Sequence, residues 1–290
     1  MSRLFDRCTG LAGCLLLLAA APAAAGGKLL ATGGATQIEG TAGGGLTPWA
    51  VLNGYGTAGQ HGATGFISSV DTGDYRLDAI GAAFTWNDRL ELSVARQDLD
   101  LGSLSTALGL PQDARLSQDV FGAKLRVAGD IIYGRWPQVS VGLQHKRHRE
   151  FDIPDTVGAR DDTGTDLYVS VGRLLLGAAA GRNLYLNATV RATRANEIGL
   201  LGFGGPDGND RELVFEGAAG LFLDRRTVVG VEYRQKPDNL AFAGEDDWAD
   251  VFVAWFPSKH LSLTAAWLDL GSIATLDDQR GLYLSVEASF

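Results

Sequence analysis

Hydrophobic and polar residues alternate along most of the chain downstream of about residue 64. Near the C-terminus, Leu282, Leu284 and Val286 share one face of an extended segment, while Tyr283 and Ser285 share the other. A repeat of two residues is the period of a β-strand, because successive side chains point to opposite faces. The same alternation recurs in the segments 120–127, 184–191 and 229–234. The pattern predicts an all-β protein.

Segment length separates a membrane barrel from a soluble β-sandwich, which also alternates apolar and polar positions. The segments are about 9 to 12 residues long, the length that crosses a bilayer when a strand is tilted. Aromatic residues lie near the segment ends, as expected at the two membrane interfaces. They are Trp49, Tyr75, Trp86, Trp136, Trp248, Trp255 and Trp267. We therefore predict an antiparallel transmembrane β-barrel.

The connections between these segments alternate between short and long, as in barrels with short periplasmic turns and longer external loops. Short turns are predicted at 87–88, 129–137, 177–183, 224–225 and 257–259. Longer polar loops are predicted at 100–117, 149–163, 195–211, 237–246 and 271–280. Because the C-terminal strand of such a barrel ends in the periplasm, the short turns are assigned to the periplasmic side.

The strand count depends on how the Gly-rich N-terminal region is arranged. The chain from about Thr64 to Phe290 accounts for about 12 strands, and the segments 28–37 and 49–56 would raise the count to about 14. Both numbers are even, as single-chain bacterial barrels require, and we favour 14. In the alternative, this region lies in the periplasm or folds into the barrel lumen. The predicted organisation is a cleaved signal peptide at 1–25, a Gly-rich segment at 26–62 and a barrel at 63–290.

The N-terminus has the three parts of a secretory signal peptide. Arg3 and Arg7 are positive, residues 11–21 are apolar, and Ala23–Ala25 provides the small residues of a cleavage site. An uncleaved anchor is disfavoured because the apolar run is shorter than the roughly 20 residues of a membrane span. A lipoprotein is disfavoured because the apolar stretch follows Cys14 and does not precede it. Export to the Gram-negative outer membrane is the predicted route.

Composition narrows the possible chemistry. Both cysteines, Cys8 and Cys14, fall within the signal peptide, so the mature chain offers no disulfide, thiolate nucleophile or cysteine-ligated zinc. A net charge of −9 at pH 7 argues against nucleic acid as a partner. The run Gly43–Gly45 is not a phosphate-binding loop, because no Lys-Ser/Thr pair follows it. We expect no cofactor.

Several stretches of the mature chain resemble one family of proteins. They are Gly27–Gly34, Glu39–Gly40, Gly43–Leu46, Trp49–Ala50, Asp71–Asp78 and Asp88–Ser93. In these stretches the chain resembles an uncharacterised family of proteobacterial outer-membrane β-barrel proteins, most firmly over residues 27–97. The resemblance implies an outer-membrane location and no established activity, so it assigns no functional residues.

Charged residues on the polar strand faces are the candidate lumen lining: Lys124, Arg126, Arg191, Glu216, Glu232 and Arg234. Such charges set the ion preference of a pore, and the two signs are interleaved here, which predicts weak selectivity. A barrel of this size holds water unless something fills it. We therefore favour a passive pore for small polar solutes. In the alternative, paired charges and the Gly-rich segment fill the lumen of a non-conducting structural or surface-binding barrel.

The densest basic cluster ends a strand beside a long loop and is therefore expected at the external rim. We predict that Lys146, Arg147 and Arg149 contact the phosphates of lipopolysaccharide, with outer-membrane lipids as the partners. A metal site at His145 and His148 is disfavoured, because residues three apart on a strand point to opposite faces.

The chain ends on Phe290, preceded by alternating apolar residues. Outer-membrane barrels typically end in this way, so we predict that Phe290 is the assembly signal. The partners during biogenesis would be the barrel-assembly machinery and periplasmic chaperones. A lipid hydrolase or a protease is disfavoured, because neither His145 nor His148 has a nearby serine on its strand face and His61 and His260 lie at expected periplasmic turns. We expect no catalytic residues.

Overall fold

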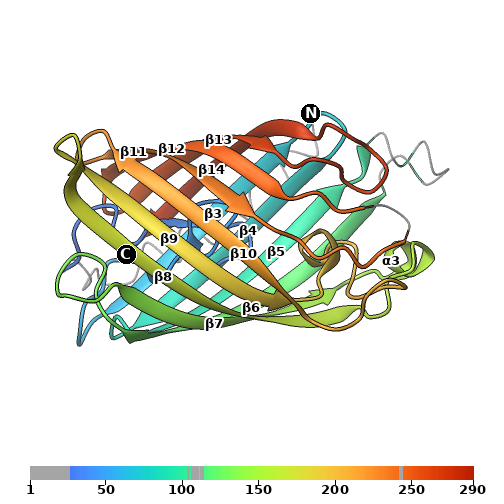
Figure 1. Cartoon of the computed structure of the whole chain (residues 1–290), viewed down its shortest axis with the longest axis horizontal. Coiled ribbons are helices and arrows are strands. Elements are labelled where there is room, and N and C mark those ends of the chain that lie inside the picture. Colours follow the sequence, from blue (N-terminus) through green and yellow to red (C-terminus); the bar gives the residue numbers. More distant parts are fainter. Residues whose placement is uncertain (1–26, 103–104, 106–110, 112–113, 242–243) are drawn as a thin grey trace.

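Twelve of the described strands form a closed antiparallel barrel in which each strand pairs with its neighbours in sequence order (Figure 1). The computed structural model describes residues 27–290 apart from 103–104, 106–110, 112–113 and 242–243, so the predicted signal peptide lies outside the described residues. The barrel strands are β3 (His61–Asp71), β4 (Arg76–Trp86), β5 (Leu90–Asp100), β6 (Arg115–Ala128), β7 (Gln138–His148), β8 (Thr163–Ala179), β9 (Arg182–Thr193), β10 (Glu212–Phe222), β11 (Thr227–Arg234), β12 (Trp248–Ser258), β13 (Leu261–Asp269) and β14 (Arg280–Ser289).

The barrel closes where the last strand meets the first. Leu284 of β14 lies opposite Ser69 of β3, and Val286 lies opposite Ile67. Beyond the last pair, Phe290 exchanges two backbone hydrogen bonds with residue 63, of 2.8 and 3.0 Å. Closure leaves no strand edge, so every strand finds its backbone partners within the wall, as a membrane interior requires.

The outer surface of the barrel is apolar. Leu282, Leu284 and Val286 are 45–50% exposed, whereas Tyr283 and Ser285 between them are buried. Large apolar side chains are exposed in the same way around the wall, including Ile80, Val94, Phe121, Val141, Val169, Val190, Phe215, Val231, Val253 and Trp267. Exposed apolar side chains on every strand face hydrocarbon, so the predicted transmembrane barrel and its outward faces are confirmed.

The connections follow the predicted rhythm. Short turns join the strands at one end, and longer connections lie at the other, where the β7–β8 loop carries the helix α3 (Asp152–Thr156) and the β9–β10 loop carries the 3₁₀-helix η1 (Asn196–Gly199). Asn87 and Asp88 in the β4–β5 turn have positive φ angles of 57° and 49°, a conformation that Asn and Asp tolerate better than most residues. Among the described helices, none is long and apolar enough to cross a membrane.

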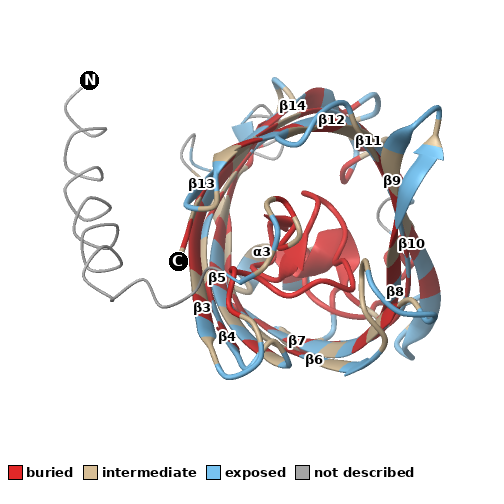
Figure 2. Ribbon diagram, turned by 90° about the vertical axis from the view of Figure 1, so that its left-hand side faces the viewer, coloured by how far each residue is buried: buried red, intermediate tan, exposed pale blue. Residues whose placement is uncertain are grey.

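The preference for 14 strands was wrong. In the described part of the Gly-rich region that precedes β3, the two-residue strands β1 (Ala35–Thr36) and β2 (Ala42–Gly43) pair with each other in a separate sheet and with no barrel strand. Because β14 pairs with β3, the barrel has no free edge to which these strands could add. The region lies inside the ring of strands instead (Figure 2). This arrangement is the alternative in which it fills the lumen.

The apolar belt predicts a depth-dependent effect of charge on stability. Val286→Arg should lower the free energy of unfolding by about 2–4 kcal/mol, because this side chain faces hydrocarbon near the middle of the membrane. Leu282→Arg is the matched control: it lies on the same face of β14 but opposite Asp71, near the long loops. Its cost should be at most about 1 kcal/mol. Urea unfolding in phospholipid vesicles measures both, and equal costs would contradict this placement of the belt.

Candidate functional site

The lumen is occupied by residues 31–56, which we call the lumen plug. Residues 33–56 are all buried, although none of them belongs to the barrel wall. Close approach explains two of its glycines. A Cβ on Gly43 would lie 2.1 Å from the carbonyl oxygen of Thr47, and a Cβ on Gly44 would lie 2.3 Å from the Glu232 carboxylate. Glycine at position 43 lets the plug backbone pack against its own Thr47 carbonyl, and glycine at position 44 lets it approach Glu232 of the wall.

Glu39, the one charged residue of the plug, faces three cations from three strands. Lys146 of β7 pairs with its Oε1 atom, Arg234 of β11 donates to its Oε2 atom over 2.8 Å, and Arg191 of β9 lies 3.7 Å away. All four side chains are at most 3% exposed. Removing one partner of a buried ion pair costs about 3–5 kcal/mol, because the other charges stay buried without it. Glu39 therefore fixes the position of the plug.

The same cations are also held by carboxylates of the wall. Arg191 donates to Glu216 over 2.6 Å and to Asp166 over 3.2 Å. Lys146 lies 2.8 Å from Asp166, and Arg234 lies 3.5 Å from Glu216. Asp166 and Glu216 thus give the three cations partners within the wall itself. The binding site for Glu39 is thus part of the wall.

Three further wall carboxylates bind plug backbone and hydroxyl groups. Glu91 of β5 accepts hydrogen bonds from the backbone N–H groups of Asn53 (2.7 Å) and Ala42 (3.2 Å). Glu232 of β11 accepts from the Leu46 N–H (2.9 Å) and from the indole of Trp49 (3.0 Å), and Glu287 of β14 accepts from the Thr36 hydroxyl (2.6 Å). The plug thereby supplies hydrogen-bond donors to three carboxylates that are buried in the lumen.

Donors from the wall satisfy plug carbonyl groups in turn. Lys124 of β6 donates to the carbonyls of Ala42 and Val51, each over 2.9 Å. Gln138 and Ser140 of β7 both donate to the Ala50 carbonyl over 2.6 Å. The plug is therefore held in place by polar contacts with several strands of the wall.

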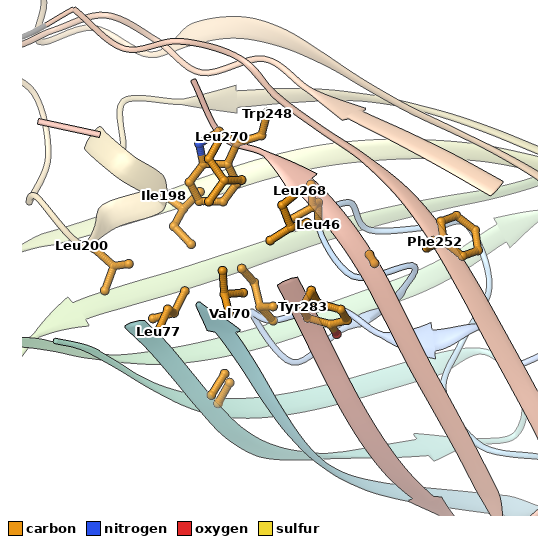
Figure 3. Close-up of a cluster of buried hydrophobic side chains, with 14 of the residues drawn as sticks. Leu46, Val70, Leu77, Ile198, Leu200, Trp248, Phe252, Leu268, Leu270 and Tyr283 are labelled. Atoms are coloured by element: carbon orange, nitrogen blue, oxygen red, sulfur yellow. The ribbon is translucent and has the colours of Figure 1, made fainter. Parts of the chain in front are cut away.

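A second layer closes the end with the long loops. Residues 194–211, which we call the outer cap, join β9 to β10, and residues 195–203 of this loop are buried. Lys146 donates to the Ile198 carbonyl over 2.8 Å, and His148 contacts the Leu200 carbonyl over 2.6 Å. Ile198 and Leu200 join Trp248 and Leu270 in an apolar cluster above the plug (Figure 3).

The cap and the plug leave little space between them. The cavity that they enclose, lined by Leu46 of the plug, Leu200 of the cap and Leu268 of the wall among others, has a volume of about 30 Å³. That is room for only about two water molecules. The described residues therefore close the lumen at two levels.

The structure places five of the six predicted lining residues deep in the lumen: Lys124, Arg191, Glu216, Glu232 and Arg234, all at most 3% exposed. They contact the plug or each other, so they do not line an open channel. Arg126 lies elsewhere, at the short-turn mouth, where it pairs with Asp88 and Asp130.

The predicted lipid-contact residues do not share one face. Lys146 is 0% exposed and points into the lumen toward Glu39, so the expectation that it contacts lipopolysaccharide was wrong. Its position in β7 is two residues from the buried Gln144 and His148, and alternation turns all three inward. Arg147 and Arg149 are exposed on the outside. The ring of Phe290 lies outside the seam, 6.0 Å from the His260 ring, and its role in assembly stays a prediction.

Sequence patterns did not single out Glu39 as a functional residue. Its partners are distant in sequence, with Arg234 195 positions away. One signal was available: Glu39 is a lone charge in a Gly-rich stretch that precedes a chain whose inward faces carry several cations.

Comparison with known proteins gives the family. Residues 32–287 match the family model described as "Protein of unknown function (DUF3034)". The chain belongs to the DUF3034 family. No curated protein matches it. Membership includes both the plug and the barrel, because the match begins within the plug and ends within β14.

Solved structures of similar shape are outer-membrane proteins. They include the outer membrane protein Omp33 of Acinetobacter baumannii (TM-score 0.46, 9% identity, 80% of this chain and 98% of that chain) and the KdgM porin (0.47, 9%, 79% and 99%). An outer membrane channel from Pseudomonas putida F1 is also similar (0.44, 11%, 79% and 94%). All three TM-scores are below 0.5, so nothing about the activity of this chain follows from them.

The outer cap predicts a pH dependence. Both oxygens of Glu245 accept from the Glu197 N–H at 3.0 Å, and Lys236 lies 2.7 Å from the Glu197 carboxylate. Burial, followed by repulsion from Glu197, raises the pKa of Glu245 from 4.5 to about 8. At a pH between those two values, the Glu245 carboxyl group is protonated while it contacts the cap and ionised once the contact is broken. The contact should therefore weaken, and the cap should loosen, as pH rises from about 5 to 8.

Hydrogen exchange of the 195–203 amides measures this loosening. We expect exchange to accelerate with pH beyond its intrinsic pH dependence in the wild-type protein, and to lose this excess in Glu245→Gln, which cannot ionise. The same excess in Glu245→Gln would contradict the assignment to this carboxyl group.

Proposed function

We propose that this protein is an outer-membrane channel whose resting state is closed by the lumen plug and whose cargo is small polar solutes. The observation that carries the proposal is the Glu39 site, where a plug carboxylate binds three wall cations that are themselves anchored to the wall. Because the cations keep partners without Glu39, the wall can hold its form while the plug moves.

Location in the outer membrane is supported by the apolar belt and by the predicted signal peptide. A closed barrel with a lipid-facing exterior satisfies its backbone hydrogen bonds inside a membrane. We propose that periplasmic chaperones and the barrel-assembly machinery deliver it there, with Phe290 as the recognition residue.

The polar nature of the plug contacts favours a gate over a permanent filling. Hydrogen bonds to Glu91, Lys124 and Glu232 can be exchanged for water when the plug shifts, at a small net cost per bond. The same wall groups would then line a wet passage with both signs of charge. A barrel of twelve strands is wide enough for such a passage.

A non-conducting structural barrel is the second candidate. It is favoured by the pairing of Lys146 and Arg191 with Glu39. All three side chains are at most 1% exposed, as in a permanently filled interior. In that case the plug completes the core of the barrel, and its removal would destabilise the protein without opening a path.

Conductance in planar bilayers separates the two. Glu39→Gln keeps the volume of the side chain but removes the charge that faces three cations, so the open population should rise about a hundredfold or more. Glu212→Gln, an exposed position at the end of β10, is the control for loss of one negative charge and should behave as the wild type.

A reversible lock makes the test specific to the plug. A Cβ on Gly172 of β8 would lie 3.1 Å from the Cβ of Ala50, so a shift of the plug by a few tenths of an ångström gives the roughly 3.5–4.5 Å separation of a disulfide. The two native cysteines lie in the predicted signal peptide, so Ala50→Cys with Gly172→Cys adds one thiol pair to the mature chain. In the Glu39→Gln background this pair should close the channel when oxidised and reopen it when reduced. Absence of conductance in the reduced protein would support the structural barrel and refute the gate.

A further inference from the structure

A row of charged side chains follows the outer surface of β5, β6 and β7 at the level where the apolar belt ends. Arg96 lies opposite Asp119, and Asp119 lies opposite Arg147. Val94 and Phe121, which are 45% and 49% exposed, are the outward residues next to Arg96 and Asp119 along their strands. Because outward positions recur every second residue, the row lies about 7 Å from them toward the long loops. The charges therefore lie where hydrocarbon gives way to lipid headgroups.

The row has a surplus of positive charge. Arg96 and Arg149 each donate to the Asp119 carboxylate over 3.0 Å, and all three side chains reach solvent. Arg147 is exposed and makes no ion pair with another described residue. Arg96 and Arg149 thus share one carboxylate, and Arg147 adds a third positive charge beside them, on a protein whose net charge is −9. We call Arg96, Asp119, Arg147 and Arg149 the basic row.

Two exterior arginines on another face at this end of the barrel are balanced. Arg76 pairs with Asp78 at 3.2 Å, and Arg280 lies near both Asp269 (2.9 Å) and Asp278 (3.5 Å). These pairs leave no positive surplus, so the basic row distinguishes one face of the barrel from the face at β13 and β14.

An apolar hollow lies on the same face, toward the middle of the membrane. In register across the wall, an outward row joins residues of β5 to β10: Leu92, Ala123, Leu143, Leu167, Ala192 and Leu213. The two alanines in this row are short, and the surface around them forms an open hollow of about 530 Å³, lined mostly by leucine, valine and alanine, with Lys124 and Tyr168 also at its edge. A lipid chain fits this chemistry, because most of the surrounding side chains are aliphatic.

We infer that this face is a binding site for lipopolysaccharide, with lipid phosphates on the basic row and an acyl chain in the apolar hollow. Guanidinium groups bind phosphate through paired hydrogen bonds, and the bonds to Asp119 hold Arg96 and Arg149 ready for it. The site depends on the outer surface alone, so it is independent of the proposed gate. It replaces the predicted cluster: Arg147 and Arg149 remain, Arg96 is added, and Lys146 is excluded because it faces the lumen.

Binding of lipid A to the purified full-length barrel in detergent micelles tests the site. Three ligands are compared: lipid A with both phosphates, the same lipid without phosphates, and inorganic phosphate alone. The variants are Arg96→Gln with Arg147→Gln for the row and Ala123→Phe for the hollow. The matched control is Arg76→Gln with Arg280→Gln, and unchanged gel mobility without heating shows that each variant is folded.

Loss of each arginine in the row should weaken binding of phosphorylated lipid A about fivefold, so about twenty-fivefold for the pair. The control pair should leave it unchanged, and Ala123→Phe should weaken it without changing phosphate binding. Equal binding of the lipid without phosphates would overturn the role of the basic row. Equal affinity for inorganic phosphate would show that the row binds free anions and overturn the lipid site, and an equal loss in the control pair would assign the effect to net charge alone.

Discussion

Glu39 carries the single negative charge of the lumen plug, and Lys146, Arg191 and Arg234 converge on it from three strands. Taking these charges out of water is costly, and only close pairing offsets the cost. The plug therefore has one position in which all four groups are satisfied. Its glycines and the wall carboxylates that bind its backbone are arranged around that position.

The wall of the barrel meets two opposite requirements with one repeat of two residues. Outward side chains such as Val286 face lipid, while their neighbours such as Ser285 face an interior filled by protein. An interior of charged groups would be unstable without either water or partners. The plug supplies the partners, which explains how a barrel of this width contains buried charges such as Lys124 and Glu91.

The strands, turns and outward faces could be predicted because each is encoded locally, by alternation and by turn residues. The plug could be predicted only as one alternative for the Gly-rich region, because its segment has no period and its partners lie up to 251 residues away, as for Thr36 and Glu287. Lys146 shows the same limit. Its basic neighbours suggested an external surface, whereas the alternation along β7 turns its side chain into the lumen, toward Glu39, which is distant in sequence.

Amide hydrogen exchange of the folded protein in lipid vesicles tests the central claim, that the plug is seated in the lumen by buried charges. The N–H groups of Ala42, Leu46 and Asn53 donate to wall carboxylates and should exchange as slowly as the amides of the barrel strands. Glu39→Gln should accelerate their exchange and leave the strand amides unchanged. Fast exchange of these three amides in the wild-type protein, at the rate of the exposed turn at 224–226, would contradict the account.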